Sequence, residues 1–139
     1  MLPEWPPGTV TILATAGNPP HAIPVSTALR AGPRRVLIGL AATRDSLARL
    51  RADPSVSLAI VCRGVAVTAY GRARVLDDAP VVEGVVAVDI EVASVQDHDR
   101  PTFELEAGVR WRWTDADAEG RDAEVRAALE RLAAVTETG

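Results

Sequence analysis

The chain of 139 residues has the length of one ordinary domain, with 47% hydrophobic residues, 24% charged residues and a formal net charge of −4. An acidic chain lacks the excess of cationic side chains that binding to nucleic acid phosphates requires, so no nucleic acid partner is expected. All 15 basic residues are arginines, which excludes Schiff-base chemistry on lysine and the lysine of a phosphate-binding loop.

The cysteine content and the amino-terminal residues indicate in which cellular compartment the protein is expected. No segment approaches the roughly 20 apolar residues of a membrane-spanning helix, so no membrane association is expected. The start MLPEWPPG has neither a basic stretch nor an apolar run, and one cysteine cannot form an internal disulfide. These features predict a cytoplasmic protein. No linker or repeat divides the chain, so residues 1–139 are expected to form a single domain.

The first third of the chain predicts three strands followed by a short helix. Residues 10–15 and 21–29 are predicted as two strands of a hairpin, because the turn-forming sequence AGNPP separates two runs that favour β structure. The apolar run VLIGL at 36–40 predicts a buried third strand. Residues 43–54 then have helical spacing, with Thr43 as the expected N-cap and Asp53-Pro54 as the stop.

The middle of the chain predicts three longer strands. Residues 56–62 and 65–76 are expected to pair across the tight turn Arg63-Gly64. In the second of these strands one face is expected to be wet or to face a cofactor, and it carries Thr68, Tyr70, Arg72 and Arg74. Residues 85–95 alternate in the same way, with Val86, Val88, Ile90 and Val92 predicted inward and Asp89 and Glu91 outward.

The last third predicts one more strand and a helix. Residues 109–114 alternate between apolar residues and arginines, which predicts a seventh strand with Trp111 and Trp113 on one face. A helix is expected from Asp115 onward, capped by Thr114 or Asp115. Its apolar residues have the spacing of a single stripe that packs on the strands, and they are Val125, Ala128, Leu129, Leu132 and Ala133.

The order of these segments is specific. A hairpin with a His-Ala-x-Pro-Val strand, a third strand and a short helix ending in Asp-Pro precede PSVSLAIV and a long strand ending AYGRARVLDD. From about Thr9 to Asp78 this order resembles the pyridoxamine 5'-phosphate oxidase-like split barrels. The continuation RWRWTDADAEGRD is similar to small actinobacterial members of that group.

The resemblance implies a mainly β fold, namely a Greek-key split barrel with a carboxyl-terminal helix. It also implies a homodimer with two sites for flavin mononucleotide (FMN) or a deazaflavin between the subunits. The cofactor would carry the redox chemistry of an oxidoreductase whose substrate stays unassigned. Carried over by position, the cofactor-binding residues are Pro24, Val25, Ser26, Gly39, Leu40, Thr43, Arg44, Ser46 and Arg49.

At the short helix the chain departs from its relatives, which carry a basic pair where Asp45 and Ser46 stand here. Loss of two charged hydrogen bonds would weaken phosphate binding by about two to four powers of ten. Arg44 and Arg49, together with the free N–H groups of the helix start, are the groups that could compensate. If a phosphate-bearing cofactor binds, its phosphate is therefore expected at the start of this helix.

The remaining polar side chains have weaker patterns. His21 has no partner at catalytic spacing, and His98 with Asp97 and Asp99 is read as a solvated loop rather than a metal site, so no metal is expected. Ser26 lacks the partners of a hydrolase nucleophile. Cys62 is predicted to be a small buried residue. No catalytic residue is assigned.

Three tryptophans, Trp5, Trp111 and Trp113, could stack on a cofactor ring, although an inward tryptophan pair on a strand is more often part of a core. Arg72 and Arg74 are read mainly as an exposed strand face. Two functions therefore stay open: a flavin-dependent or deazaflavin-dependent oxidoreductase, and a cofactor-free split-barrel homodimer that acts as a binding or structural protein.

Overall fold

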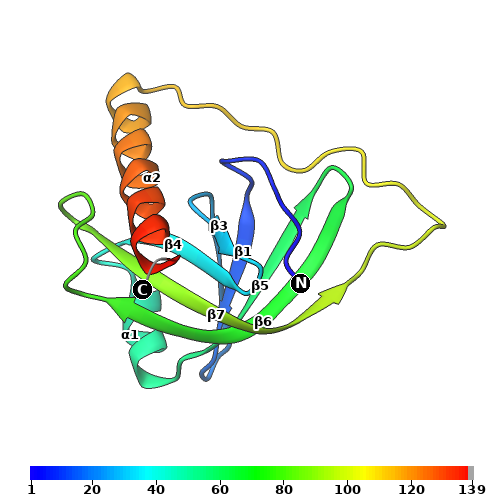
Figure 1. Cartoon of the computed structure of the whole chain (residues 1–139), viewed down its shortest axis with the longest axis horizontal. Helices are drawn as coiled ribbons and strands as arrows, with labels where there is room; N and C mark the ends of the chain where they lie inside the picture. The colour runs from blue at the N-terminus through cyan, green and yellow to red at the C-terminus, as the bar shows by residue number, and fades with distance from the viewer. Residues whose placement is uncertain (138–139) are drawn as a thin grey trace.

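The computed structural model describes residues 1–137, in which seven strands and two helices are present (Figure 1). The elements are β1 (Thr11–Thr15), β2 (His21–Val25), β3 (Leu29–Gly32), β4 (Arg35–Ala41), α1 (Asp45–Ala52), β5 (Ser55–Cys62), β6 (Val65–Leu76), β7 (Val85–Asp97) and α2 (Ala116–Glu137). Neither helix combines the length and the apolar character that crossing a membrane requires in this part of the chain.

All seven strands belong to one antiparallel sheet with the order β2-β1-β5-β6-β7-β4-β3. Its longest ladder joins β6 to β7, from Val67 opposite Asp97 to Leu76 opposite Ala87, with a register shift after Tyr70. Gly71 follows that shift, and a Cβ there would collide with the carbonyl oxygen of Glu91. This register shift is a β-bulge, and it requires glycine at position 71. The bulge bends the two long strands.

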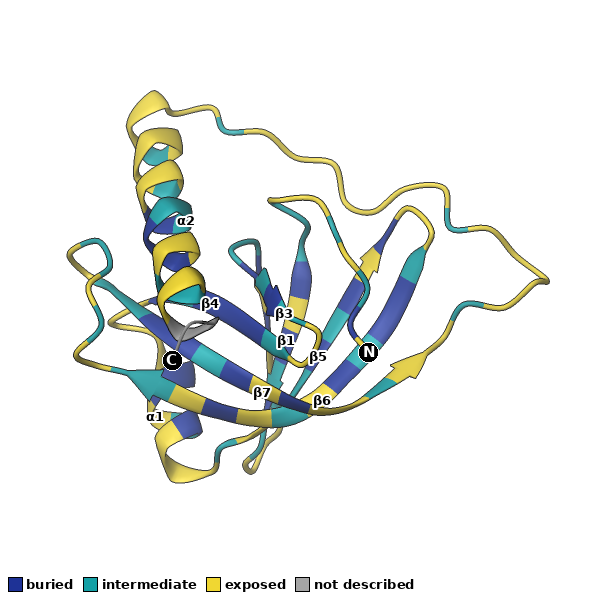
Figure 2. Ribbon diagram, viewed as in Figure 1, coloured by how far each residue is buried: buried dark blue, intermediate teal, exposed yellow. Residues whose placement is uncertain are grey.

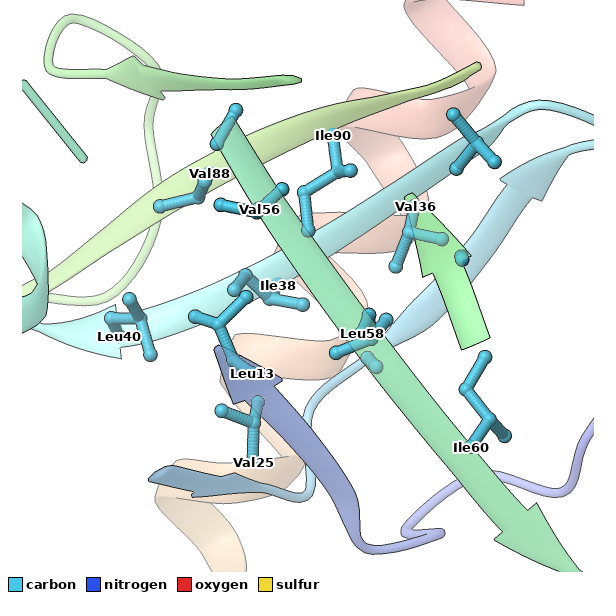
Figure 3. Packing of buried hydrophobic residues seen from close by; sticks show 14 of the residues in the cluster. Leu13, Val25, Val36, Ile38, Leu40, Val56, Leu58, Ile60, Val88 and Ile90 are labelled. Atoms are coloured by element: carbon cyan, nitrogen blue, oxygen red, sulfur yellow. The ribbon is translucent and has the colours of Figure 1, made fainter. Parts of the chain in front are cut away.

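The sheet curls around a core of aliphatic side chains, so that β4 and β7 face β1 and β5 (Figure 3). Figure 2 shows the resulting alternation of buried and exposed residues along β5 and β6. The largest side chains of this core that are almost completely buried are Leu13, Val36, Ile38, Leu50, Leu58, Ile60, Val88, Ile90 and Val92. Each such side chain contributes roughly 1.5–3 kcal/mol by leaving water.

A second apolar cluster lies on the other face of β4, under α2. Leu37 and Ala87 from the sheet contact Val125 and Leu129 from the helix. β4 is consequently buried on both faces, which confirms the buried strand predicted from its continuous apolar run. The start of α2 is also as predicted, because the Asp115 carboxylate accepts a hydrogen bond from the N–H of Asp117 at 3.0 Å.

The alternation predicted for β6 and β7 is confirmed. Val88, Ile90 and Val92 are buried in the main core, and Val86 is half-buried against it. Glu91 is exposed, whereas Asp89 is half-buried and forms an ion pair with Arg35.

The prediction of one strand over 21–29 is wrong, because β2 ends at Val25 and β3 begins at Leu29. Val25 is the last residue of β2 with a partner on β1. Beyond it the Thr27 hydroxyl donates to the Gly39 carbonyl at 2.9 Å and accepts from the Gly39 N–H at 3.0 Å. These bonds turn the chain from the β1 edge toward β4.

The prediction of a strand over 109–114 is also wrong, since no strand is present between β7 and α2. Trp111 is 39% exposed rather than part of the core. A further correction concerns α1, whose N-cap is Arg44 and not Thr43. The N–H of Arg44 bonds to the carbonyl of Ala41 at 2.9 Å, so Thr43 lies in a turn before the helix.

Candidate functional site

A pocket of about 240 Å³ lies between the amino-terminal segment, the turn that joins β2 to β3, and α2. These parts of the chain are far apart in sequence and are brought together by the packing of α2 on β3 and β4. The pocket is lined by Glu4, Trp5, Pro7, Gly8, Ser26, Thr27, Ala28, Leu29, Arg30, Arg126, Leu129 and Glu130.

Trp5 forms a wall of the pocket that is fixed in position. Its indole N–H donates to the Ala28 carbonyl at 2.9 Å, and its ring packs against the main core. Upstream, Leu2 is buried in that core, and its N–H donates to the Pro33 carbonyl at 3.0 Å. Two hydrogen bonds and a buried side chain therefore hold the amino-terminal segment over the β2–β3 turn.

Arg126 reaches into the pocket from α2. Its Nε bonds to the Asp122 carboxylate at 2.7 Å, one helical turn earlier, and its Nη2 lies 3.4 Å from the Ser26 carbonyl oxygen. Arg30 is the second cation of the lining, and its Nε donates to the Leu2 carbonyl at 3.2 Å. Glu4 and Glu130 balance the two cations. The lining therefore combines an aromatic wall with two cationic and two acidic side chains.

A second, more open hollow of about 840 Å³ lies beside the first and shares Pro7, Gly8 and Arg126 with it. Trp111 and Trp113 line this hollow, with ring centroids 5.1 Å apart and ring planes at 82°. The Trp111 indole N–H donates to the Gly8 carbonyl at 2.8 Å. The two tryptophans thus face a surface hollow in place of the core.

At the start of α1, where a cofactor phosphate is expected, Arg49 is engaged by other groups of the protein. Arg49 bonds to the Asp45 carboxylate at 3.0 Å and to the Pro19 carbonyl at 2.9 Å, so its guanidinium connects α1 to the β1–β2 turn. The Asp45 carboxylate itself is 71% exposed in the first helical turn, where it repels an anion. Arg44 is exposed and makes no side-chain capping bond.

No protein-family model and no curated protein matches the sequence. Solved structures match the fold. A provisional pyridoxamine 5'-phosphate oxidase from Listeria innocua aligns with a TM-score of 0.55 at 15% identity, over 65% of this chain and 88% of that chain. The flavin reductase component of a bacterial two-component tryptophan halogenase aligns at 0.54 and 13% identity, over 67% and 81%. An F420 reductase aligns at 0.54 and 11% identity, over 64% and 90%.

The chain has the flavin-binding split-barrel fold. This fold was predicted from the order of the motifs, and the structural similarity confirms it. The identities are low, so the similarity concerns the arrangement of the strands.

The split barrel does not bring the nine predicted cofactor-binding residues into one place. Ser26 lines the pocket beside Trp5. Val25 and Leu40 are buried in the main core, and Pro24 is exposed on the edge strand β2. The side-chain position of Gly39 is covered by α2, because a Cβ there would lie 2.9 Å from Cγ1 of Val125.

Ser46, another of the predicted residues, is 1% exposed. Its hydroxyl oxygen has no hydrogen-bond partner among residues 1–137. The hydroxyl is therefore buried, whereas the neighbouring Thr43 and Arg44 lie at the surface. The predicted anion site divides between buried and exposed groups.

Several polar residues outside the pocket have local partners. His98 Nε2 lies 2.8 Å from the Thr68 hydroxyl oxygen, and the Asp97 carboxylate accepts from the N–H of Asp99. Residues 1–137 contain no group of three or more His, Cys, Asp and Glu side chains placed to hold a metal. On β6, the Tyr70 hydroxyl donates to the Gln96 side chain at 3.0 Å.

Sequence reasoning missed Arg30 and Arg126. Each belongs to an amphipathic element in which an arginine is unremarkable, so no sequence signal distinguished either of them. Their common role arises only when α2 packs beside the β2–β3 turn.

Proposed function

We propose that this split barrel binds a flavin-type cofactor, FMN or a deazaflavin, and that it is an oxidoreductase acting on a small molecule. The observation that carries the proposal is the pocket formed by Trp5, Ser26 and Arg126 at the end of β2. Ser26 belongs to the segment that the family resemblance assigns to the cofactor. The similar solved structures include a flavin reductase and an F420 reductase.

The size of the pocket sets how much of the cofactor it can enclose. Pockets that enclose a whole drug-sized ligand have volumes of about 300–1,000 Å³. A pocket of about 240 Å³ accommodates a ring system but not the whole of FMN. The remainder would extend into the adjoining hollow, which Arg126 also lines.

When bound, a flavin supplies electron or hydride transfer. The chain contributes binding and orientation. Trp5 offers an aromatic wall whose indole is fixed by Ala28. Arg126 offers guanidinium N–H donors beside the Ser26 carbonyl, and α2 shields one side of the pocket from water.

The other candidate is a cofactor-free split-barrel homodimer with a binding or structural role. The start of α1 favours this candidate. Asp45 is negatively charged there, and Arg49 is already bonded to Asp45 and to the Pro19 carbonyl, so few groups are left to bind a phosphate. A homodimer is part of both proposals. A reducing, cytoplasmic location is proposed for both as well, because Cys62 is a free and buried thiol.

Titration of the purified protein with FMN and with a deazaflavin, followed by flavin fluorescence, separates the two proposals. Wild-type protein is expected to bind at least one of them. Arg126→Ala is expected to weaken binding by about 10-fold to 100-fold, since a hydrogen bond to a charged group contributes roughly 1.5–3 kcal/mol. Arg131→Ala is the matched control, because Arg131 lies on α2 but lines neither the pocket nor the adjoining hollow.

Circular dichroism of the variants checks that the loss of the Asp122 ion pair has not unfolded α2. Unchanged affinity in a folded Arg126→Ala protein would assign the cofactor to another place. Absence of binding by the wild type would leave the cofactor-free homodimer.

A further inference from the structure

Residues 98–115 form a long arm that leaves β7 and runs along the outside of the molecule to α2 (Figure 1). Figure 2 shows that nearly all of this arm is exposed. Its apolar side chains are exposed as well, with Phe103 at 47%, Val109 at 67% and Trp111 at 39%. Large apolar side chains gathered on one exposed segment indicate an interaction surface.

The arm contacts its own barrel at few points. The Leu105 carbonyl accepts from the N–H of Gly64 at 3.0 Å, and the Trp111 indole N–H donates to Gly8. Between and beyond these points, the backbone groups of residues 106–113 make no backbone hydrogen bond within residues 1–137. An extended segment with unpaired N–H and C=O groups is a template for another strand.

The sequence of the arm has the alternation of a strand that lacks a partner. From 103 to 113 the odd positions are apolar, namely Phe103, Leu105, Ala107, Val109, Trp111 and Trp113. The even positions on either side of Gly108 are charged, namely Glu104, Glu106, Arg110 and Arg112. Acidic residues precede the glycine and basic residues follow it.

This order makes the segment complementary to itself. Suppose that two copies of the segment pair antiparallel, with the two Gly108 residues opposite each other. A residue a given number of positions before Gly108 in one copy then faces the residue the same number of positions after Gly108 in the other. The charged pairs are then Glu104 with Arg112 and Glu106 with Arg110. On the opposite face the apolar pairs are Phe103 with Trp113, Leu105 with Trp111, and Ala107 with Val109. Opposite charges and aromatic pairs directly across a ladder stabilise strand pairing.

We propose that residues 103–113 are a dimerisation surface whose partner is the same segment of a second copy of this chain. The two segments form an antiparallel two-stranded ribbon with the twofold axis at Gly108. Twofold symmetry requires a self-complementary surface, and this segment meets the requirement in both charge and apolar character. An unrelated partner would not require the acidic and basic halves to mirror each other about one residue.

Gly108 lies close to the end of β5. A Cβ at this position would lie 2.8 Å from the carbonyl oxygen of Val61 and 3.1 Å from Cα of Cys62. Glycine therefore allows the arm to lie against the end of β5.

Charge reversal tests both the surface and its register by sedimentation velocity over a range of protein concentrations. Wild-type protein is expected to dimerise. Glu106→Arg places like charges opposite each other in two symmetry-related pairs, and it is expected to weaken the dimer by about tenfold or more. The double variant Glu106→Arg, Arg110→Glu restores both pairs and should restore the dimer.

The matched control is Glu104→Arg, Arg110→Glu, which has the same net charge as the restoring variant but places like charges opposite each other throughout. It is expected to remain weakened. All these side chains are exposed, so circular dichroism should show an unchanged fold. The proposal would be overturned by a monomeric wild type or by a dimer that Glu106→Arg leaves intact. It would also be overturned if the control Glu104→Arg, Arg110→Glu restored the dimer and Glu106→Arg, Arg110→Glu did not.

Discussion

Gly39 of β4 lies so close to Val125 of α2 that a Cβ on the glycine would be 2.9 Å from Cγ1 of the valine. The same Cβ would be 3.3 Å from Cγ1 of Val85. Glycine at this position therefore sets how closely α2 approaches the sheet. The closeness of α2 in turn forms one side of the pocket beside Trp5.

Gly39→Ala is expected to destabilise the protein by about 1–3 kcal/mol, because the added methyl group overfills the contact with α2. Urea unfolding measures this change. Gly32→Ala in β3 is the matched control, since the nearest atom to its Cβ is 3.9 Å away. Val125→Ala combined with Gly39→Ala should recover part of the loss, and additive losses would show that the two residues do not compete for the same space.

Gly120 lies in α2, and apart from its own stretch of the helix no atom lies within 4 Å of the position of its Cβ. Gly120→Ala is expected to stabilise the protein by up to about 1 kcal/mol, because alanine loses less backbone entropy on forming a helix. The corresponding rise in the melting temperature is roughly 3–5 °C. Ala123→Gly on the same helix should produce a fall of similar size, and equal melting temperatures for the two variants would contradict this account.

Asp89 of β7 forms two hydrogen bonds with Arg35 of β4, at 3.0 and 2.8 Å, and the carboxylate is 12% exposed. Asp89→Asn is expected to lower the free energy of unfolding by about 1–3 kcal/mol, since a charge-assisted pair at a half-buried site is broken. Asp77→Asn removes the partner of Arg51 in a pair whose side chains are 60% and 49% exposed. Its cost should be below about 1 kcal/mol in the same unfolding measurement.

Burial raises the pKa of the Cys62 thiol above its usual value. The thiol is therefore expected to react with a maleimide at neutral pH far more slowly in the folded protein than in urea. The folded protein keeps its proton at a pH where the unfolded chain has lost it, so the contribution of Cys62 to stability falls as the pH rises above about 9. Comparison with Cys62→Ala over pH 7–10 isolates this effect, and a constant difference between the two proteins would argue against it.

The sequence alone determined the elements whose pattern is local. The alternation along β6 and β7 predicts which side chains face the core, because a strand turns successive residues to opposite faces. The stripe on α2 is predicted for the same kind of reason, with a period of 3.6 residues. The split barrel was predicted from the resemblance of the motifs between about Thr9 and Asp78 to the pyridoxamine 5'-phosphate oxidase-like group.

Only the tertiary structure decided which segments with a strand-like sequence pair with another strand. Residues 109–113 alternate as clearly as β7 does, yet they remain an exposed arm because no strand within residues 1–137 pairs with them. The predicted strand over 21–29 divides for a related reason. Val25 pairs with Thr11, the first residue of β1, and beyond Val25 the Thr27 hydroxyl bonds to Gly39 instead. A strand forms only when its backbone makes hydrogen bonds to another part of the chain. The sequence of one strand does not specify which part that is.

The candidate site depended on tertiary structure even more strongly. Ser26 could be nominated from sequence, but the cavity next to it exists because Trp5 and Arg126 approach the same turn from the two ends of the chain. Gly39 and Ser46 were also predicted from the sequence, yet α2 covers Gly39 and Ser46 is almost completely buried. A sequence pattern assigns a residue to one face of its own element, whereas the packing of distant elements decides whether that face meets a cavity, another side chain or water.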